Sequence, residues 1–253
     1  MNAVLYVCHG SRVMEGCKQA IEFVQKIQKR VSVPIQEISF LELAMPTIEE
    51  GFAQCIKKGA TEIVVIPVFL LAASHVKNDI PKKLKLMKTC YPNVQISFGN
   101  PFGVHERMID ILLDRIEEKG TNVEAKIAIL LVGRGSTDPD TIDNFEEIIN
   151  LFHSKTNYSY VKKCFLAAAD PLFEEILEDT LSRNVDFIIV IPYLLFTGRL
   201  VKGMKKTILS MSADKEIILC DYLGFHPYLE EILVERVNET VEQRGIPRCH
   251  PAT

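Results

Sequence analysis

Two histidines and one glutamate lie at positions that a parallel sheet would bring to the same edge. His9, Glu42 and His75 each follow a different strand-like segment of the chain. Because the carboxyl ends of parallel strands meet at one edge of a sheet, we expect the three side chains to converge there. Imidazole and carboxylate groups bind divalent metals and also accept protons in catalysis. These residues therefore predict a site for metal binding or proton transfer.

The chain repeats itself at a spacing of 125 residues. The blocks at 4–11, 40–46 and 65–67 are echoed, in order, at 129–136, 165–171 and 190–192. A repeat of this length predicts two homologous domains, which we place at residues 1–120 and 121–253.

The second copy serves as an internal control for the candidate site. It has Arg134, Ala167 and Leu200 at the positions of His9, Glu42 and His75. The scaffold positions Gly10, Ser11, Pro46 and Pro67 keep their residue types in both copies. A residue needed only for folding would be required twice, so the loss of all three polar residues indicates that they serve function in the first copy.

Each copy alternates strand-like and helix-like segments. In the first copy we expect strands at 4–8, 35–41, 63–68 and 94–98, separated by amphipathic helices. This alternation predicts an α/β fold with four-stranded parallel sheets covered by helices on both faces. We expect the strand order 2-1-3-4 from the usual arrangement of doubly wound folds, and not from these residues.

Composition excludes several classes of protein. The 253 residues are 47% hydrophobic and 25% charged, as in soluble globular proteins, and the net charge of −4 argues against a general nucleic-acid binder. The longest apolar run, 63–73, is shorter than the ~20 residues of a membrane-spanning helix. We expect no signal peptide, because the first residues lack a basic segment and a cleavage site. Seven cysteines without a Cys-x-x-Cys pair predict reduced thiols in a cytoplasmic protein.

The remaining histidines have simpler interpretations. His105 and His226 follow a glycine in both copies, so we expect both to mark helix starts. We expect His153 to be exposed to solvent. Cys249 and His250 lie in a polar tail and are weak evidence for a second metal site.

Two residues beside His9 invite alternative chemistry. Cys8 resembles a nucleophile next to a base, but adjacent strand residues point to opposite faces, so we expect a buried thiol. Ser11 with Gly10 could hold a phosphate, although an N-cap role for Ser11 is the simpler interpretation.

The motifs around these residues resemble the class II chelatases, which insert divalent metals into tetrapyrroles. The resemblance rests on 5–12, 38–43 with 46–48, and 66–71 with 74–76, and it extends over nearly the whole chain, including 193–198. It implies two Rossmann-like domains with the tetrapyrrole in the cleft between them. It also implies that His9 and His75 bind the metal and act in catalysis with Glu42.

Within this family the chain is most similar to the enzymes that insert Fe²⁺ into sirohydrochlorin, the last step of sirohaem biosynthesis. The resemblance implies that the ring contacts the loop before His75, and we expect two arginines of the second copy to bind its carboxylates. These expected substrate contacts are Leu70, Leu71, Ala72, Ala73, Ser74, Arg134 and Arg199. No permanently bound cofactor is expected, because Fe²⁺ is a substrate and Co²⁺ is a possible replacement.

Three alternatives stay open at this stage. A cobaltochelatase of cobalamin biosynthesis would use the same ligands, although the chain lacks the histidine-rich and Cys-x-x-Cys segments of the long cobalt enzymes. A metal or tetrapyrrole carrier would bind the same molecules without turnover. A phosphatase with a His9 nucleophile is disfavoured, because Cys8 stands where an arginine would be expected.

We expect a cytoplasmic monomer without nucleic-acid or membrane partners, since one duplicated chain can form the whole cleft.

Overall fold

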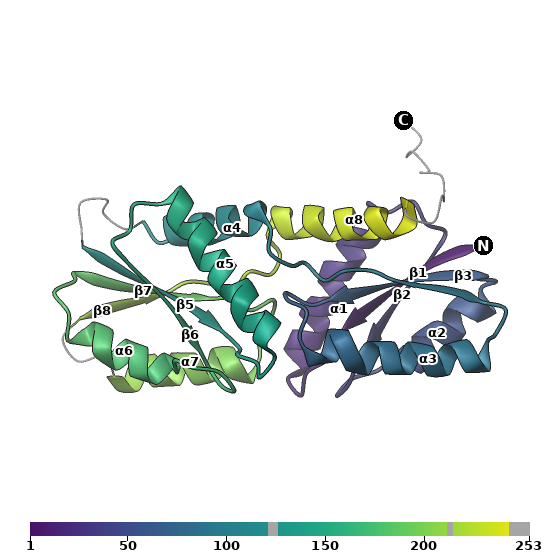
Figure 1. Cartoon of the computed structure of the whole chain (residues 1–253), viewed down its shortest axis with the longest axis horizontal. Helices are drawn as coiled ribbons and strands as arrows, with labels where there is room; N and C mark the ends of the chain where they lie inside the picture. Colours follow the sequence, from purple (N-terminus) through teal and green to yellow (C-terminus); the bar gives the residue numbers. More distant parts are fainter. Residues whose placement is uncertain (121–125, 212–214, 243–253) are drawn as a thin grey trace. The chain divides into compact units, whose positions relative to one another are not determined.

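The computed structural model describes residues 1–120, 126–211 and 215–242, which form two four-stranded parallel sheets flanked by helices (Figure 1). The strands are β1 (Asn2–Cys8), β2 (Ile35–Phe40), β3 (Glu62–Val68), β4 (Gln95–Phe98), β5 (Ile127–Gly133), β6 (Tyr160–Phe165), β7 (Phe187–Pro192) and β8 (Glu216–Leu219). The helices are α1 (Met14–Gln28), α2 (Ile48–Lys57), η1 (His75–Asp79), α3 (Ile80–Cys90), α4 (Glu106–Glu117), α5 (Pro139–Lys155), α6 (Phe173–Leu181), α7 (Arg199–Met211) and α8 (Pro227–Glu242). None of the helices in these ranges is long and apolar enough to cross a membrane.

The strand order confirms the predicted α/β topology. The sheets run β2-β1-β3-β4 and β6-β5-β7-β8, and every pair of neighbours is parallel. Cys8, the last residue of β1, pairs with Phe40 of β2 and with Val68 of β3. The three strands therefore end at the same level, and the residues that follow them share one edge.

Helix α2 begins where its sequence predicts. The Thr47 hydroxyl accepts a hydrogen bond from the Glu50 N–H, while the Glu50 carboxylate accepts one from the Thr47 N–H, which is a complete capping box. The expectation for Ser11 was wrong: Val13 occupies the N-cap of α1, and the Ser11 hydroxyl accepts a hydrogen bond from the Val13 N–H inside the preceding turn.

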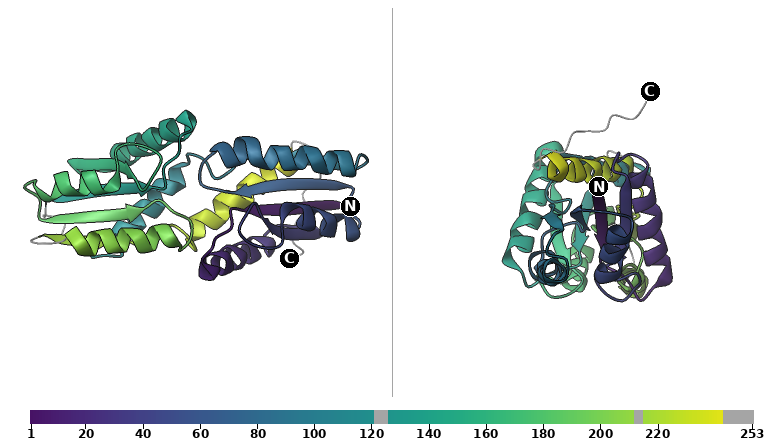
Figure 2. Two further views of the ribbon diagram at one scale, coloured as in Figure 1. Left: turned by 90° about the horizontal axis from the view of Figure 1, so that it is seen from below. Right: turned by 90° about the vertical axis from the view of Figure 1, so that its right-hand side faces the viewer.

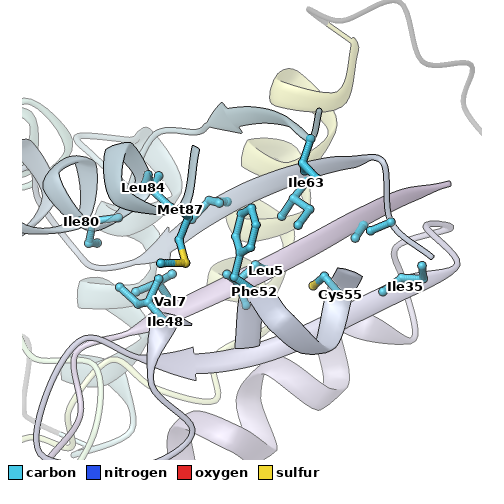
Figure 3. Packing of buried hydrophobic residues seen from close by; sticks show 14 residues of the cluster. Leu5, Val7, Ile35, Ile48, Phe52, Cys55, Ile63, Ile80, Leu84 and Met87 are labelled. Carbon is cyan, nitrogen blue, oxygen red and sulfur yellow. The ribbon is translucent and has the colours of Figure 1, made fainter. Parts of the chain in front are cut away.

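The first sheet buries an apolar face against α2 and α3 (Figure 3). Leu5 and Val7 of β1 point into this core, where they meet Phe52 and Ile48 of α2 and Met87 of α3. Phe52 is fully buried, and the second sheet has an equivalent core around Leu130, Phe173 and Leu177. These cores hold the strand ends, and so the loops beyond them, at fixed positions.

The last helix of each sequence copy belongs to the compact unit of the other copy. One unit comprises Met1–Gly103 with the chain from Leu229 onward, and the second comprises Val104–Tyr228. We call them unit 1 and unit 2. The boundaries 1–120 and 121–253, expected from the repeat, stay a prediction about the sequence copies. The compact units divide the chain elsewhere, because α4 packs on α5 and β7 in unit 2. In unit 1, α8 covers the sheet face opposite α2 and α3 (Figures 1 and 2).

An arginine fastens each exchanged helix to its unit. Arg236 of α8 donates three hydrogen bonds to the carbonyls of Pro101 and Phe102 at 2.8–3.3 Å. Arg115 of α4 donates in the same way to carbonyls of the segment 222–224. The Phe102 and Gly103 N–H groups in turn donate to the carbonyls of Phe69 and Leu70, after β3. Arg236 thus stabilises a segment that supports the loop leading to His75.

Replacing Arg236 by Ala should lower the free energy of unfolding by about 1–3 kcal/mol, because two carbonyls of a part-buried segment lose their charged donor. Urea unfolding followed by circular dichroism measures this loss. The control is Lys18→Ala, which removes only an exposed ion pair with Glu22 at 3.7 Å and should cost less than about 1 kcal/mol. Equal losses in the two variants would contradict the fastening role.

Candidate metal centre

His9, Glu42 and His75 converge at the carboxyl edge of the first sheet, as the sequence predicted. Each offers one ligand atom, and the three atoms lie within 4.8 Å of one another. The imidazole rings of His9 and His75 meet edge to face, with centroids 4.9 Å apart. Three ligand atoms at this spacing can surround a single metal ion after small side-chain rotations.

His9 is positioned by the first turn after β1. The Leu41 N–H donates to the Cys8 carbonyl at 2.8 Å, and the Glu42 N–H donates to the His9 carbonyl at 3.1 Å. The β1–α1 and β2–α2 loops therefore lie side by side, which brings Glu42 next to His9. The His9 Nδ1 lies 3.1 Å from the Gly10 carbonyl. When Nδ1 carries the proton and donates to this carbonyl, Nε2 has the lone pair that can bind a metal.

Glu42 is the most exposed member of the centre. Its carboxylate lies 3.7 Å from the His9 Nδ1, and 47% of its side chain is accessible to solvent, against 32% for His9. A half-exposed carboxylate can exchange protons with water and can also offset the charge of a bound cation. The centre carries one formal negative charge when both imidazoles are neutral, which suits a divalent ion that must later be released.

His75 lies at the start of a single π-helical turn, η1. The Ile80 N–H donates to the His75 carbonyl, so the turn is one residue wider than an α-helical turn. Such turns are often found at functional sites. The His75 Nδ1 lies 2.7 Å from the Asp79 carboxylate and must be the donor, which leaves the Nε2 lone pair for a metal.

Asp79 is a partner of His75 that the sequence interpretation missed. The signal was present, because a carboxylate four residues after a helical histidine lies on the same face. The second copy has Met204 at the corresponding position, so Asp79 follows the same asymmetry as the three ligands.

The other candidate residues fall outside this cluster. Leu70, Ala72 and Ala73 are half-buried, Ser74 is exposed, and Leu71 is buried with 9% exposure. Arg134 and Arg199 are exposed at the end of β5 and the start of α7, in unit 2. Their predicted contacts with substrate stay predictions.

The remaining histidines and Cys8 behave as expected. The Nδ1 atoms of His105 and His226 accept hydrogen bonds from the N–H groups two residues later, at helix starts, and His153 is exposed. Burial raises the pKa of the Cys8 thiol to about 12, so it stays protonated and is neither a nucleophile nor a ligand at neutral pH. Cys249 and His250 lie outside the described residues.

Replacing Gly10 by Ala should displace Glu42. Gly10 has φ of +93°, and an added Cβ would lie 1.8 Å from the Glu42 carbonyl oxygen. Gly135→Ala is the matched control, because its Cβ would lie 1.7 Å from the Ala167 carbonyl at φ of +90°. Both variants should lose at least about 2 kcal/mol of unfolding free energy, through backbone strain and the clash. Only Gly10→Ala should weaken Co²⁺ binding in a spectroscopic titration; equal Co²⁺ affinities in the two variants would argue against Glu42 as a ligand.

Replacing Asp79 by Ala should lower the Co²⁺ affinity by about 10- to 100-fold, because the His75 ring loses the acceptor that sets its orientation and tautomer. The same Co²⁺ titration measures this. Asn78→Ala is the control in the same turn, since the Asn78 side chain donates to the Ser74 hydroxyl at 3.3 Å and not to His75. A Co²⁺ affinity unchanged in Asp79→Ala would remove the orienting role.

Comparison with known proteins agrees with this site and fold. Residues 3–119 and 128–240 each match the family model CbiX. The chain is 45% identical over 246 residues to the sirohydrochlorin ferrochelatase of Priestia megaterium, covering 97% of this chain and 92% of that protein. It is 38% identical to the sirohydrochlorin cobaltochelatase of the same organism, covering 98% of this chain and 83% of that protein. The structure of SirB from Bacillus subtilis with Fe³⁺ superposes with a TM-score of 0.88 and 38% identity, over 96% of this chain and 97% of that one. The resemblance to the chelatases is thereby confirmed, and the chain belongs to the CbiX family.

Proposed function

We propose that this protein is a lyase that inserts Fe²⁺ into sirohydrochlorin to form sirohaem. The observation that carries the proposal is the convergence of His9, Glu42 and His75 in the first copy alone. The proposal is supported by the relatives of similar length that carry this name.

The reaction sets three requirements that this site can meet. The ion must lose water, two pyrrole N–H groups of the ring must lose protons, and the ion must then pass to the four ring nitrogens. Neutral imidazoles from His9 and His75 hold Fe²⁺ without trapping it, whereas thiolates would bind it too firmly. The ring gains one Fe²⁺ and loses two protons. The charge of the site is therefore unchanged once both protons have left it.

We assign the proton transfer to His9 and Glu42. His9 lies next to Glu42 and can accept a pyrrole proton once the ion has moved to the ring. Glu42, which is half-exposed, can relay that proton to solvent. His75 is held by Asp79 and serves chiefly as a ligand, because His9 is the imidazole that lies next to the half-exposed Glu42.

The remaining substrate contacts are part of the same proposal. Leu70, Leu71, Ala72, Ala73 and Ser74 would present small and apolar surface to the ring beside His75. Arg134 and Arg199 are exposed guanidinium groups that match the geometry of the substrate's carboxylates.

Cobalt insertion is the second candidate, favoured by the similarity to a cobaltochelatase over nearly the whole chain. Histidine and carboxylate ligands accept both ions. An anaerobic assay with sirohydrochlorin in large excess over protein decides between the candidates, with Fe²⁺ and Co²⁺ run in parallel. Many turnovers, faster with Fe²⁺, are expected; faster turnover with Co²⁺ would make the protein a cobaltochelatase, and one equivalent of product would make it a carrier.

We also propose that the protein acts as a cytoplasmic monomer. The duplicated sequence supports this, because both copies are supplied by one chain. Sedimentation velocity at micromolar concentration tests the oligomeric state, and a dimer would contradict it.

Replacing His9 by Ala, His75 by Ala or Glu42 by Gln should lower kcat by about 10²- to 10⁴-fold, because each change removes a ligand or a proton acceptor. The absorbance change of metal insertion measures the rate. His153→Ala, at an exposed helical position, is the control and should keep full activity. Undiminished turnover in any of the three site variants would remove that residue from the mechanism.

Replacing Arg134 or Arg199 by Leu should raise KM several-fold with little loss of kcat, because these residues would bind parts of the substrate that do not react. Initial rates over a range of sirohydrochlorin concentrations separate the two constants. Lys205→Leu, at an exposed position of α7, is the control. An unchanged KM in both arginine variants would contradict the assignment.

A further inference from the structure

A second feature of unit 1 has no role in holding the metal. It is a groove of about 530 Å³ between α1 and the β2–α2 loop. Its apolar lining includes Met14, Cys17 and Ile21 on one side, and Leu43 and Ala44 on the other. The volume falls within the range of small-molecule binding sites. We call this feature the α1 groove.

The α1 groove and the metal centre are built from the same two loops. Leu43 directly follows the ligand Glu42, and Ser11, which lines the groove, is two residues beyond the ligand His9. The backbone hydrogen bonds from Leu41 to Cys8 and from Glu42 to His9 join these loops. The lining of the groove is therefore adjacent in sequence to two residues of the metal centre.

The groove exposes large apolar side chains that folding alone does not require. Met14 and Leu43 line the groove and expose 86% and 51% of their surface, and Met45, next to the lining residue Ala44, exposes 64%. Leu43 also has a left-handed backbone with φ of 61°, as does Ala168 of the second copy with φ of 57°. The loop shape is thus shared by the two copies, whereas the large apolar side chain at its tip belongs only to the first.

The second copy lacks most of the large apolar side chains found at and beside the groove. The positions of Met14, Ile21, Leu43 and Met45 carry Pro139, Glu146, Ala168 and Asp170 there. Charge changes in the same direction: exposed Arg12 and Lys18 of the first copy become Thr137 and Asp143. The residue types that make the groove apolar, and the lysine on its rim, are therefore confined to the first copy, whereas Glu22 of the rim is kept as Glu147.

We propose that the α1 groove binds part of the tetrapyrrole, which presents an apolar ring face with carboxylates around its edge. Met14, Leu43 and Met45 contact the apolar ring, and Arg12 and Lys18 pair with its carboxylates. Lys18 can do so because its side chain is 66% exposed and makes only an exposed contact with Glu22 at 3.7 Å. This inference rests on the proposed function and adds substrate-binding residues on the metal-binding unit itself.

The test replaces groove residues by those of the second copy, in the double variant Leu43→Ala/Met45→Asp and the single variant Lys18→Asp. The matched control is Leu86→Ala/Leu209→Asp, which makes the same chemical changes at residues exposed by 54% and 79% on α3 and α7. Binding of metal-free sirohydrochlorin is followed by its fluorescence, and Co²⁺ affinity is measured in parallel to show that each variant keeps a folded metal centre.

The double variant should raise the sirohydrochlorin Kd about tenfold, and Lys18→Asp should raise it about threefold with a smaller effect at high salt. The control variant and all Co²⁺ affinities should stay within about twofold of the wild type. Equal sirohydrochlorin Kd values in the groove and control variants would overturn the inference. It would also fail if sedimentation showed a wild-type dimer that the double variant disrupts while ring affinity is unchanged, because a second copy would then be the occupant.

The outcome for the wild type separates this inference from the proposed function. Ring binding that depends on the groove, but without turnover, would overturn the proposed activity and leave the groove assignment standing. Turnover by the wild type, together with groove variants that keep the ring affinity, would leave the proposed activity standing and overturn the groove assignment. A wild type that does not bind sirohydrochlorin would overturn both.

Discussion

The parallel pairing of β1 with both β2 and β3 is the constraint on which the candidate site depends. Cys8 lies opposite Phe40 and Val68, so three segments that are far apart in sequence end at one level. A shift of one residue in either pairing would turn the side chains of that strand to the other face and carry its loop away from His9. The fully buried cores on the sheet therefore do more than stabilise the fold, because they hold the distances among the metal ligands.

The candidate metal centre is suited to holding an ion loosely, because it combines two neutral imidazoles with one carboxylate. Two imidazoles and one half-exposed carboxylate provide a single negative charge, and the nearest thiol, Cys8, is buried and protonated. This combination fits a protein that must release its metal to another acceptor. Orientation comes from neighbours that do not bind the ion: the Gly10 carbonyl for His9 and the Asp79 carboxylate for His75. A site of this kind loses function when the supporting residues move, even if all three ligands remain.

Because the chain contains two copies of one fold, residues that the fold requires can be distinguished from residues that only the candidate site requires. Both copies keep the left-handed glycine after the first strand, at Gly10 and Gly135, and the left-handed residues at Leu43 and Ala168. They also keep the arginine that fastens the exchanged helix, at Arg115 and Arg236. His9, Glu42, His75 and Asp79, and the apolar residues Met14, Ile21 and Leu43 of the α1 groove, are not repeated in the sequence of the second copy. What is present twice therefore describes the requirements of the fold, and what is present once describes the function.

The sequence by itself predicted the repeated α/β fold and the convergence of His9, Glu42 and His75, whose roles as ligands stay a prediction. Buried strands appear as continuous apolar runs, and the repeat shows which polar residues a second copy can lose, so His9, Glu42 and His75 could be predicted without coordinates. Only the tertiary structure decided the rest. The π-helical turn that joins Asp79 to His75 depends on a backbone widening that residue types do not reveal. The start of α1 at Met14, with Ser11 in a turn, depends on how the loop packs against its neighbour. The exchange of α4 and α8 could not be predicted. The sequence of an amphipathic helix indicates that one face is buried, but it does not indicate which sheet covers that face.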